Sequence, residues 1–234
     1  LKSSGTAGKP IVVGSYHGET KPILTGAANL SGWIKETENL YAIPVDQKVF
    51  SLYKTTKRLP LARWPNQGYF KIDEGNKISL TDNMFEDIDF NLAGASARIK
   101  SVDWQSETMT VKQHDGDKIT FNEKMIYSAK KDYGYILDNK FEFMDSAGEW
   151  YFNPGKSMLY LYYYTKPEGV VAGVLDNGIT IDKSVRHLVI QDLEISKFNN
   201  ACIQAREKSA NISIINCTLK ESTVYGIQVE QETS

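Results

Sequence analysis

The hydrophobic residues in the last third of the chain recur with a period of 24 residues. Equivalent segments begin at Gly178, Cys202 and Gly226. In each segment, one polar residue stands between two apolar residues. Such i, i+2 spacing is typical of a β-strand with one buried face, and no apolar pair continues at the i+3 and i+4 positions of a helix. A fixed period of this length indicates a repeat architecture built from β-strands.

Three short strands are expected in each repeat, because three pairs of apolar positions keep the same offset. The stacked columns are Ile179–Ile203–Ile227, Ile181–Ala205–Val229, Leu188–Ile212, Ile190–Ile214, Leu193–Cys217 and Ile195–Leu219. We expect each repeat to form one 24-residue coil of a parallel β-solenoid, with successive coils about 4.8 Å apart. Two complete repeats and a partial third cannot cover their own ends, so we expect the chain to be a fragment of a longer solenoid protein.

The repeat is absent from the middle of the chain. Residues 1–31 contain a turn rich in Gly and Pro and then a run of Ile and Val, which predicts the first coil or coils. Residues 32–168 predict an inserted all-β domain, and residues 169–234 predict the coils that follow it. The whole chain is therefore predicted to be all-β.

Local signals inside the insertion predict hairpins. The Asp-Gly turn at 115–116 and the Asn-Pro-Gly turn at 153–155 each lie between two alternating stretches. Residues 82–91 predict a short helix, with Thr81 as its N-cap.

Several segments occur in a recognisable order. They are Ser-Gly-Thr-Ala-Gly-Lys-Pro-Ile-Val-Val at 4–13, Leu-Ala-Arg-Trp-Pro-Asn at 61–66, Gly-Glu-Trp-Tyr-Phe-Asn-Pro at 148–154, and the repeats after 178. With this order the chain resembles the secreted bacterial right-handed parallel β-helix proteins of the pectate-lyase-like superfamily. The resemblance is to large members from Bacteroidota with a β-sandwich-like domain inserted after the first coils. It implies a right-handed parallel β-helix and a secreted or bacterial cell-surface location.

For function, the resemblance is less specific. The group includes polysaccharide lyases, glycoside hydrolases and surface proteins without known activity, and its catalytic residues lie on later coils along one face. No position of this sequence matches such a residue, so the catalytic residues stay unassigned. Some lyases of this fold use calcium held by scattered carboxylates, but this sequence contains no calcium-binding loop pattern.

Composition and charge exclude several partners. Of 234 residues, 41% are hydrophobic and 24% are charged, as in a soluble globular protein. The net charge of −2 provides neither a basic surface for nucleic acid nor a polybasic membrane patch, and no apolar stretch is long enough for membrane insertion. Two cysteines are too few for a disulfide framework, and the three histidines share no metal-ligand spacing, so no cofactor is evident.

One column of charged residues follows the first strand of each repeat. It consists of Asp182, Arg206 and Glu230, and Thr180, Gln204 and Gln228 are expected to point outward on the same strands. These side chains could grip a sugar chain or act as acid and base, since two coils would separate Asp182 from Glu230 by about 9.6 Å, close to the spacing of inverting glycosidases. The alternative, which we favour, is a ladder of ion pairs that keeps a flat β face soluble.

A second candidate is an aromatic stripe on the predicted strand at 158–164. Tyr160, Tyr162 and Tyr164 alternate with Leu159, Leu161 and Tyr163, so one face carries rings about 6.8 Å apart. Such rings could stack on sugars, although aromatic residues of this kind more often pack one part of a protein against another.

The leading hypothesis is a secreted carbohydrate-active β-helix protein that binds and cleaves an extended polysaccharide, as a lyase or a glycoside hydrolase. A hydrolase requires paired carboxylates, and a lyase of acidic glycans requires Lys or Arg. The alternative is a noncatalytic cell-surface or adhesin protein, exported as cargo of an outer-membrane secretion and surface-attachment machinery.

Overall fold

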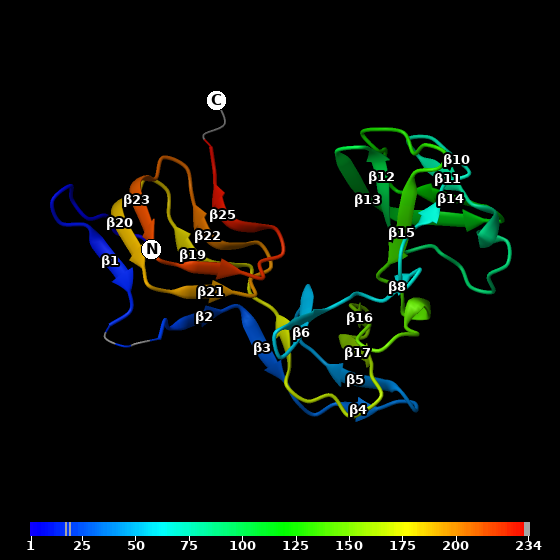
Figure 1. Cartoon of the computed structure of the whole chain (residues 1–234), viewed down its shortest axis with the longest axis horizontal. Coiled ribbons are helices and arrows are strands. Elements are labelled where there is room, and N and C mark those ends of the chain that lie inside the picture. The colour runs from blue at the N-terminus through cyan, green and yellow to red at the C-terminus, as the bar shows by residue number, and fades with distance from the viewer. Residues whose placement is uncertain (17, 19, 232–234) are drawn as a thin grey trace. The chain divides into compact units, whose positions relative to one another are not determined.

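The computed structural model describes residues 1–16, 18 and 20–231, and their regular structure is β-strand apart from two short 3₁₀ helices (Figure 1). The chain forms two compact units. The first consists of Leu1–Ser31, Asp46–Arg58 and Glu168–Ser234, and the second of Gly32–Val45 and Leu59–Pro167.

The first unit contains three parallel sheets of three strands each (Figure 1). One sheet is β19 (Asn177–Ile181), β22 (Ala201–Ala205) and β25 (Tyr225–Val229). Another is β1 (Ile11–Gly14), β20 (Arg186–Gln191) and β23 (Ala210–Ile215). The third is β2 (Ile23–Thr25), β21 (Glu194–Ser196) and β24 (Thr218–Lys220). Ile179 pairs with Ile203 and Ile203 with Ile227, so the 24-residue period of the sequence is the register of strand pairing.

The apolar columns of the repeat form the core of this unit. Ile181, Ile190, Ile195 and Ile203 are fully buried, and the equivalent residues of the last repeat pack on one side alone. Ile227 is therefore 46% exposed, although it stands in the same column as Ile203.

The backbone conformation follows the same period. Left-handed residues with φ between 48° and 64° occur in equivalent pairs: Ser184 and Lys208, His187 and Asn211, Asp192 and Asn216, Lys197 and Glu221. The side chain of Asn216 donates to Asp192 Oδ1 over 2.7 Å, which joins one equivalent pair directly. His187 lies inside β20 and has this left-handed backbone conformation.

A fourth sheet of the first unit is antiparallel where its register is defined. It orders β3 (Ala27–Leu30), β18 (Val170–Gly173), β6 (Ser51–Lys54) and β7 (Lys57–Leu59). Residues 46–58 lie within the stretch 32–168 that lacks the repeat, yet they belong to the first unit because β6 pairs with β18.

The second unit is built from two antiparallel sheets (Figure 1). The larger runs in the order β10 (Glu74–Gly75), β11 (Ser79–Thr81), β14 (Lys118–Phe121), β13 (Gln105–Asp115), β12 (Ser96–Val102), β15 (Gly134–Asp138) and β8 (Arg63–Trp64), with β9 (Phe70–Lys71) also on β15. The smaller runs β16 (Trp150–Asn153), β17 (Met158–Tyr162), β5 (Leu40–Pro44) and β4 (Ile34–Lys35). Both predicted hairpins are confirmed, as β13–β14 and β16–β17.

The helix predicted over residues 82–91 is wrong in length and in its cap. A single 3₁₀ turn, Asn83–Phe85, is present, and Asp82 caps it by accepting a hydrogen bond from the Met84 N–H over 3.1 Å. Thr81 is instead the last residue of β11. The other carboxylate oxygen of Asp82 accepts a bond from the buried Tyr135 hydroxyl over 2.7 Å. Asp and Asn make up half of residues 86–91, and these residue types favour caps and turns over helix interiors.

Candidate functional site

The charged column lies where the sequence places it, directly after β19, β22 and β25. Arg206 Nη1 is 3.2 Å from Asp182 Oδ1, so two of the three residues form an ion pair between successive repeats. Beside them, Lys183 Nζ is 2.6 Å from Glu207 Oε2. We call this surface the repeat row, defined as Asp182, Lys183, Gln204, Arg206, Glu207, Gln228 and Glu230.

Amide side chains connect the rest of the repeat row. Gln204 Nε2 donates to Gln228 Oε1 over 3.2 Å and to Glu230 Oε1 over 2.8 Å. Asn200 Nδ2 donates to the same Gln228 oxygen over 2.8 Å. Gln204 was expected to face solvent, but it is only 7% exposed, since β22 is the middle strand of its sheet and has a paired strand on each side. The row is thus a hydrogen-bonded surface rather than a set of independent side chains.

Hydrogen bonds and ion pairs favour the charged forms of Asp182 and Glu207. The backbone N–H of Lys183, and after it the Arg206 guanidinium, lowers the pKa of Asp182 below its ordinary value. The Lys183 ammonium likewise lowers the pKa of Glu207. A general acid at neutral pH requires a raised pKa, so Asp182 is suited to binding rather than to proton donation.

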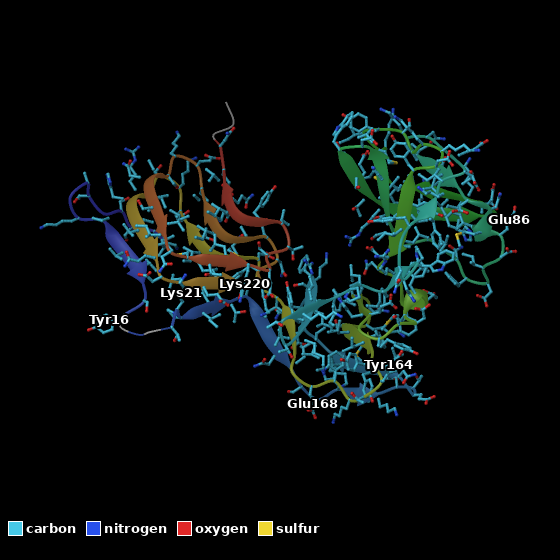
Figure 2. The ribbon with its side chains drawn as sticks, in the orientation of Figure 1. Tyr16, Lys21, Glu86, Tyr164, Glu168 and Lys220 are labelled. Atoms are coloured by element: carbon cyan, nitrogen blue, oxygen red, sulfur yellow. The ribbon has the colours of Figure 1, made fainter. Side chains whose placement is uncertain are left out.

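Ion pairs between repeats also occur outside the repeat row. Lys220 Nζ is 2.9 Å from Glu194 Oε1, and Lys197 Nζ is 3.1 Å from Glu221 Oε2 (Lys220 is labelled in Figure 2). Charge pairing between successive repeats is therefore a general feature of this unit, as the ion-ladder interpretation predicts. Each exposed pair contributes little stability by itself, because water and salt screen the attraction.

The ion pairs predict a defined response to acid. Because the folded pKa values of Asp182 and Glu207 are lowered, the stability from their ionised forms is present above the unfolded pKa and is lost as pH falls through the folded pKa. In a carboxyl-carbon NMR titration, Lys183→Met should raise the pKa of Glu207 toward its ordinary value. Arg206→Met should raise that of Asp182 only in part, since the Lys183 N–H remains. A Glu207 pKa that is unchanged by Lys183→Met would contradict the assignment.

Tyr160 and Tyr162 lie in the second unit, whereas Asp182, Arg206 and Glu230 lie in the first. On β17, Leu159 and Leu161 are fully buried, while Tyr160 and Tyr162 are half-buried on the other face, which is the predicted alternation. Asn39 Nδ2 donates to the Tyr162 hydroxyl over 3.3 Å. Tyr164 lies beyond the strand and is 68% exposed (Figure 2).

Tyr160 lines a cleft of about 320 Å³ that the sequence did not reveal. Its cross-strand partner Tyr151 and the ring of Phe141 stand beside it, with Phe141 centred 5.1 Å from Tyr160 and 6.0 Å from Tyr151. The remaining lining residues are Ala93, Gly94, Asn139, Lys140, Glu142, Asn153 and Lys156. The predicted hairpin could have brought Tyr151 opposite Tyr160. Phe141 could not be foreseen, because it lies in the 3₁₀ helix Phe141–Phe143, far along the chain from β17.

Neither a metal site nor a membrane span is found in the part of the chain that the structure describes. No three His, Cys, Asp or Glu side chains of those residues gather as metal ligands. None of their helices is long and apolar enough to cross a membrane. Cys202 and Cys217 are both free thiols, and burial raises the pKa of Cys202.

Comparison with known proteins identifies a protein of similar fold but assigns the chain to no family. No family model matches the chain, and no curated protein sequence matches it. A solved structure titled "Glycoside hydrolase" is similar in fold, with a TM-score of 0.72 over 96% of this chain. The two sequences are 14% identical, and the chain spans 52% of the length of that protein. At this identity the likeness defines an all-β fold shared with that protein.

Proposed function

We propose that the protein is a secreted or cell-surface carbohydrate-active protein that binds and cleaves an extended polysaccharide. The observation that carries the proposal is the likeness in fold, over 96% of this chain, to a protein titled glycoside hydrolase. The shared fold supplies the scaffold, and the side chains that this scaffold presents would bind the sugar.

The proposal includes a finer architecture. We infer that the parallel sheets are coils of a right-handed parallel β-helix at 1–31 and 169–234, with residues 32–168 as a β-sandwich-like insertion. The 24-residue strand register and the equivalent left-handed positions support successive coils of one design.

The repeat row suits a polymer better than a small molecule. Parallel strands present equivalent side chains about 4.8 Å apart, so donors and acceptors recur along the row. Arg206 and Lys183 offer cationic donors, and Glu207 and Glu230 offer acceptors. A sugar chain that lies across successive strands would therefore face hydrogen-bond donors and acceptors on each strand.

Hydrolysis is our first choice of reaction, because the protein with the shared fold is titled a hydrolase. Elimination by a lyase would instead need a basic residue near an acidic sugar, and the lysine and arginine of the repeat row are already paired with carboxylates. The catalytic residues remain unassigned within the described part of the chain.

Incubation of the protein with a panel of neutral and acidic polysaccharides tests this proposal. We expect new reducing ends from at least one polymer, without the ultraviolet absorbance of unsaturated uronates. Heat-denatured protein is the control. Ultraviolet-absorbing products would replace hydrolysis with lyase chemistry, and the absence of both products across the panel would overturn the proposed cleavage.

A noncatalytic adhesin at the cell surface is the second candidate function. The specific observation in its favour is the paired state of the repeat row, in which Asp182 has a lowered pKa and an arginine partner. Such a protein would be exported and attached by an outer-membrane secretion machinery. Binding to a polysaccharide without any product would support this candidate over the enzyme.

A further inference from the structure

The cleft in the second unit has an aromatic wall that is held in place from two directions. Tyr160 and Tyr151 are cross-strand partners on β17 and β16, which fixes their separation. Phe141 approaches both rings edge-on, at interplanar angles of 76° and 71°, and remains 41% exposed. Aromatic side chains in this state offer apolar surface to a ligand at little entropic cost.

The polar groups around this wall have unused hydrogen-bonding capacity. Neither the Tyr151 nor the Tyr160 hydroxyl bonds to another of the described residues, and the Asn139 side-chain amide also lacks such a partner. Burial, Glu142 and Tyr160 raise the pKa of Tyr151, so its hydroxyl stays protonated as a donor. A tyrosine hydroxyl can donate and accept, and an amide offers both kinds of group. A ligand rich in hydroxyls would satisfy them.

Charge in the cleft is unbalanced. Lys140 Nζ is 3.5 Å from Glu142 Oε2 and also donates to the Ala93 carbonyl over 3.2 Å, so that pair is largely neutralised. Lys156 lies in the turn between β16 and β17, is exposed, and forms no ion pair with the described residues. The cleft therefore carries one uncompensated positive charge at its edge.

We propose that this cleft binds a sugar residue that carries a carboxylate, with the ring against Tyr160 and Phe141 and the carboxylate toward Lys156. Sugars combine an apolar C–H face with hydroxyls, which matches an aromatic wall surrounded by unpaired donors and acceptors. A volume of about 320 Å³ is at the lower end of ligand pockets, so the site accommodates one or two sugar rings. This inference rests on the proposed function in carbohydrate binding. It adds a second sugar-binding site, because the cleft lies in the second unit and the repeat row lies in the first.

Titration of the ¹⁵N-labelled protein with a glucuronic-acid disaccharide and with its neutral glucose counterpart tests the proposal. We expect amide shifts around residues 139–142 and 151–160, and tighter binding of the acidic sugar. Lys156→Gln should weaken acidic-sugar binding about threefold to fivefold, the range for an exposed ion pair, and leave the neutral sugar unaffected. Tyr160→Ala should weaken both. Lys131→Gln, an exposed lysine of the same unit outside the cleft, is the matched control.

Each outcome decides the proposal. Equal affinity for both sugars, no effect of Lys156→Gln, or shifts confined to other residues would overturn it. A sulfated disaccharide that binds more tightly than the carboxylated one would overturn the choice of carboxylate. Because Lys156 is exposed, its substitution remains informative even if Tyr160→Ala fails to fold. Amide shifts in the cleft with a disaccharide report on this site alone, whereas product formation from whole polysaccharides reports on the proposed function, so the two can fail separately.

Discussion

Glu149→Ala is expected to lower the free energy of unfolding by about 2–5 kcal/mol. Glu149 is 2% exposed, and its carboxylate accepts three backbone hydrogen bonds, from Arg63 over 3.1 Å, Asp145 over 3.1 Å and Ser146 over 3.0 Å. Alanine would leave these donors without their acceptor, at about 1–3 kcal/mol for each that stays buried. Relief of the buried charge offsets part of this loss.

Urea unfolding of the variant measures this effect, with an unchanged m-value as the sign that the denatured state is the same. The matched control is Glu123→Ala, which removes an exposed glutamate of the same unit and should change stability by no more than about 0.5 kcal/mol. A loss below about 1 kcal/mol for Glu149→Ala would show that water replaces the carboxylate.

The raised pKa of Glu149 also predicts how stability depends on pH. Burial raises its pKa, and the backbone N–H groups of Asp145, Arg63 and Ser146 oppose that shift only in part. A carboxyl whose folded pKa is raised favours the protonated form, so its contribution to stability falls as pH rises through the folded pKa. This direction is opposite to that of Asp182 and Glu207 in the repeat row.

Ile203→Ala is expected to cost about 2–5 kcal/mol, while the same substitution at Ile227 should cost less than about 1 kcal/mol. Both residues stand in one column of the repeat, but Ile203 is fully buried and Ile227 is 46% exposed. Ile203 is covered by neighbours on both sides, so truncation leaves a cavity. Because both variants replace Ile by Ala, the difference between their losses in the free energy of unfolding measures the contribution of stacking between repeats.

The measurement is again urea unfolding, followed by far-ultraviolet circular dichroism to confirm that the β structure is retained. Equal losses for Ile203→Ala and Ile227→Ala would contradict the stacked core. Such a result would mean that the third repeat is buried in solution as deeply as the second.

The strand register could be predicted because the same pattern of apolar residues recurs every 24 residues. Ile179 with Ile203, Leu188 with Ile212 and Ile195 with Leu219 are paired as the 24-residue offset predicts. Equivalent residues of successive repeats stack on one another, so the sequence period indicates which residues are in contact. The hairpins of the second unit were also predictable, since Asp-Gly and Asn-Pro-Gly turns act locally.

Features that depend on distant neighbours were missed. The left-handed conformation of His187 inside a strand and the burial of Gln204 follow from stacking between repeats, which no local preference encodes. The cleft needs Phe141 from a 3₁₀ turn to meet Tyr160 on β17. The two ion pairs of the repeat row could be anticipated from alternating signs at equivalent positions, whereas their geometry could not.

Electrophoresis through gels that each contain one polysaccharide shows whether this protein recognises such a polymer. We expect retarded mobility in at least one gel, with the retardation weakened in a variant that carries both Arg206→Ala and Lys183→Ala. Unchanged mobility of the wild-type protein across a broad panel of neutral and acidic polysaccharides would mean that it does not bind polysaccharide.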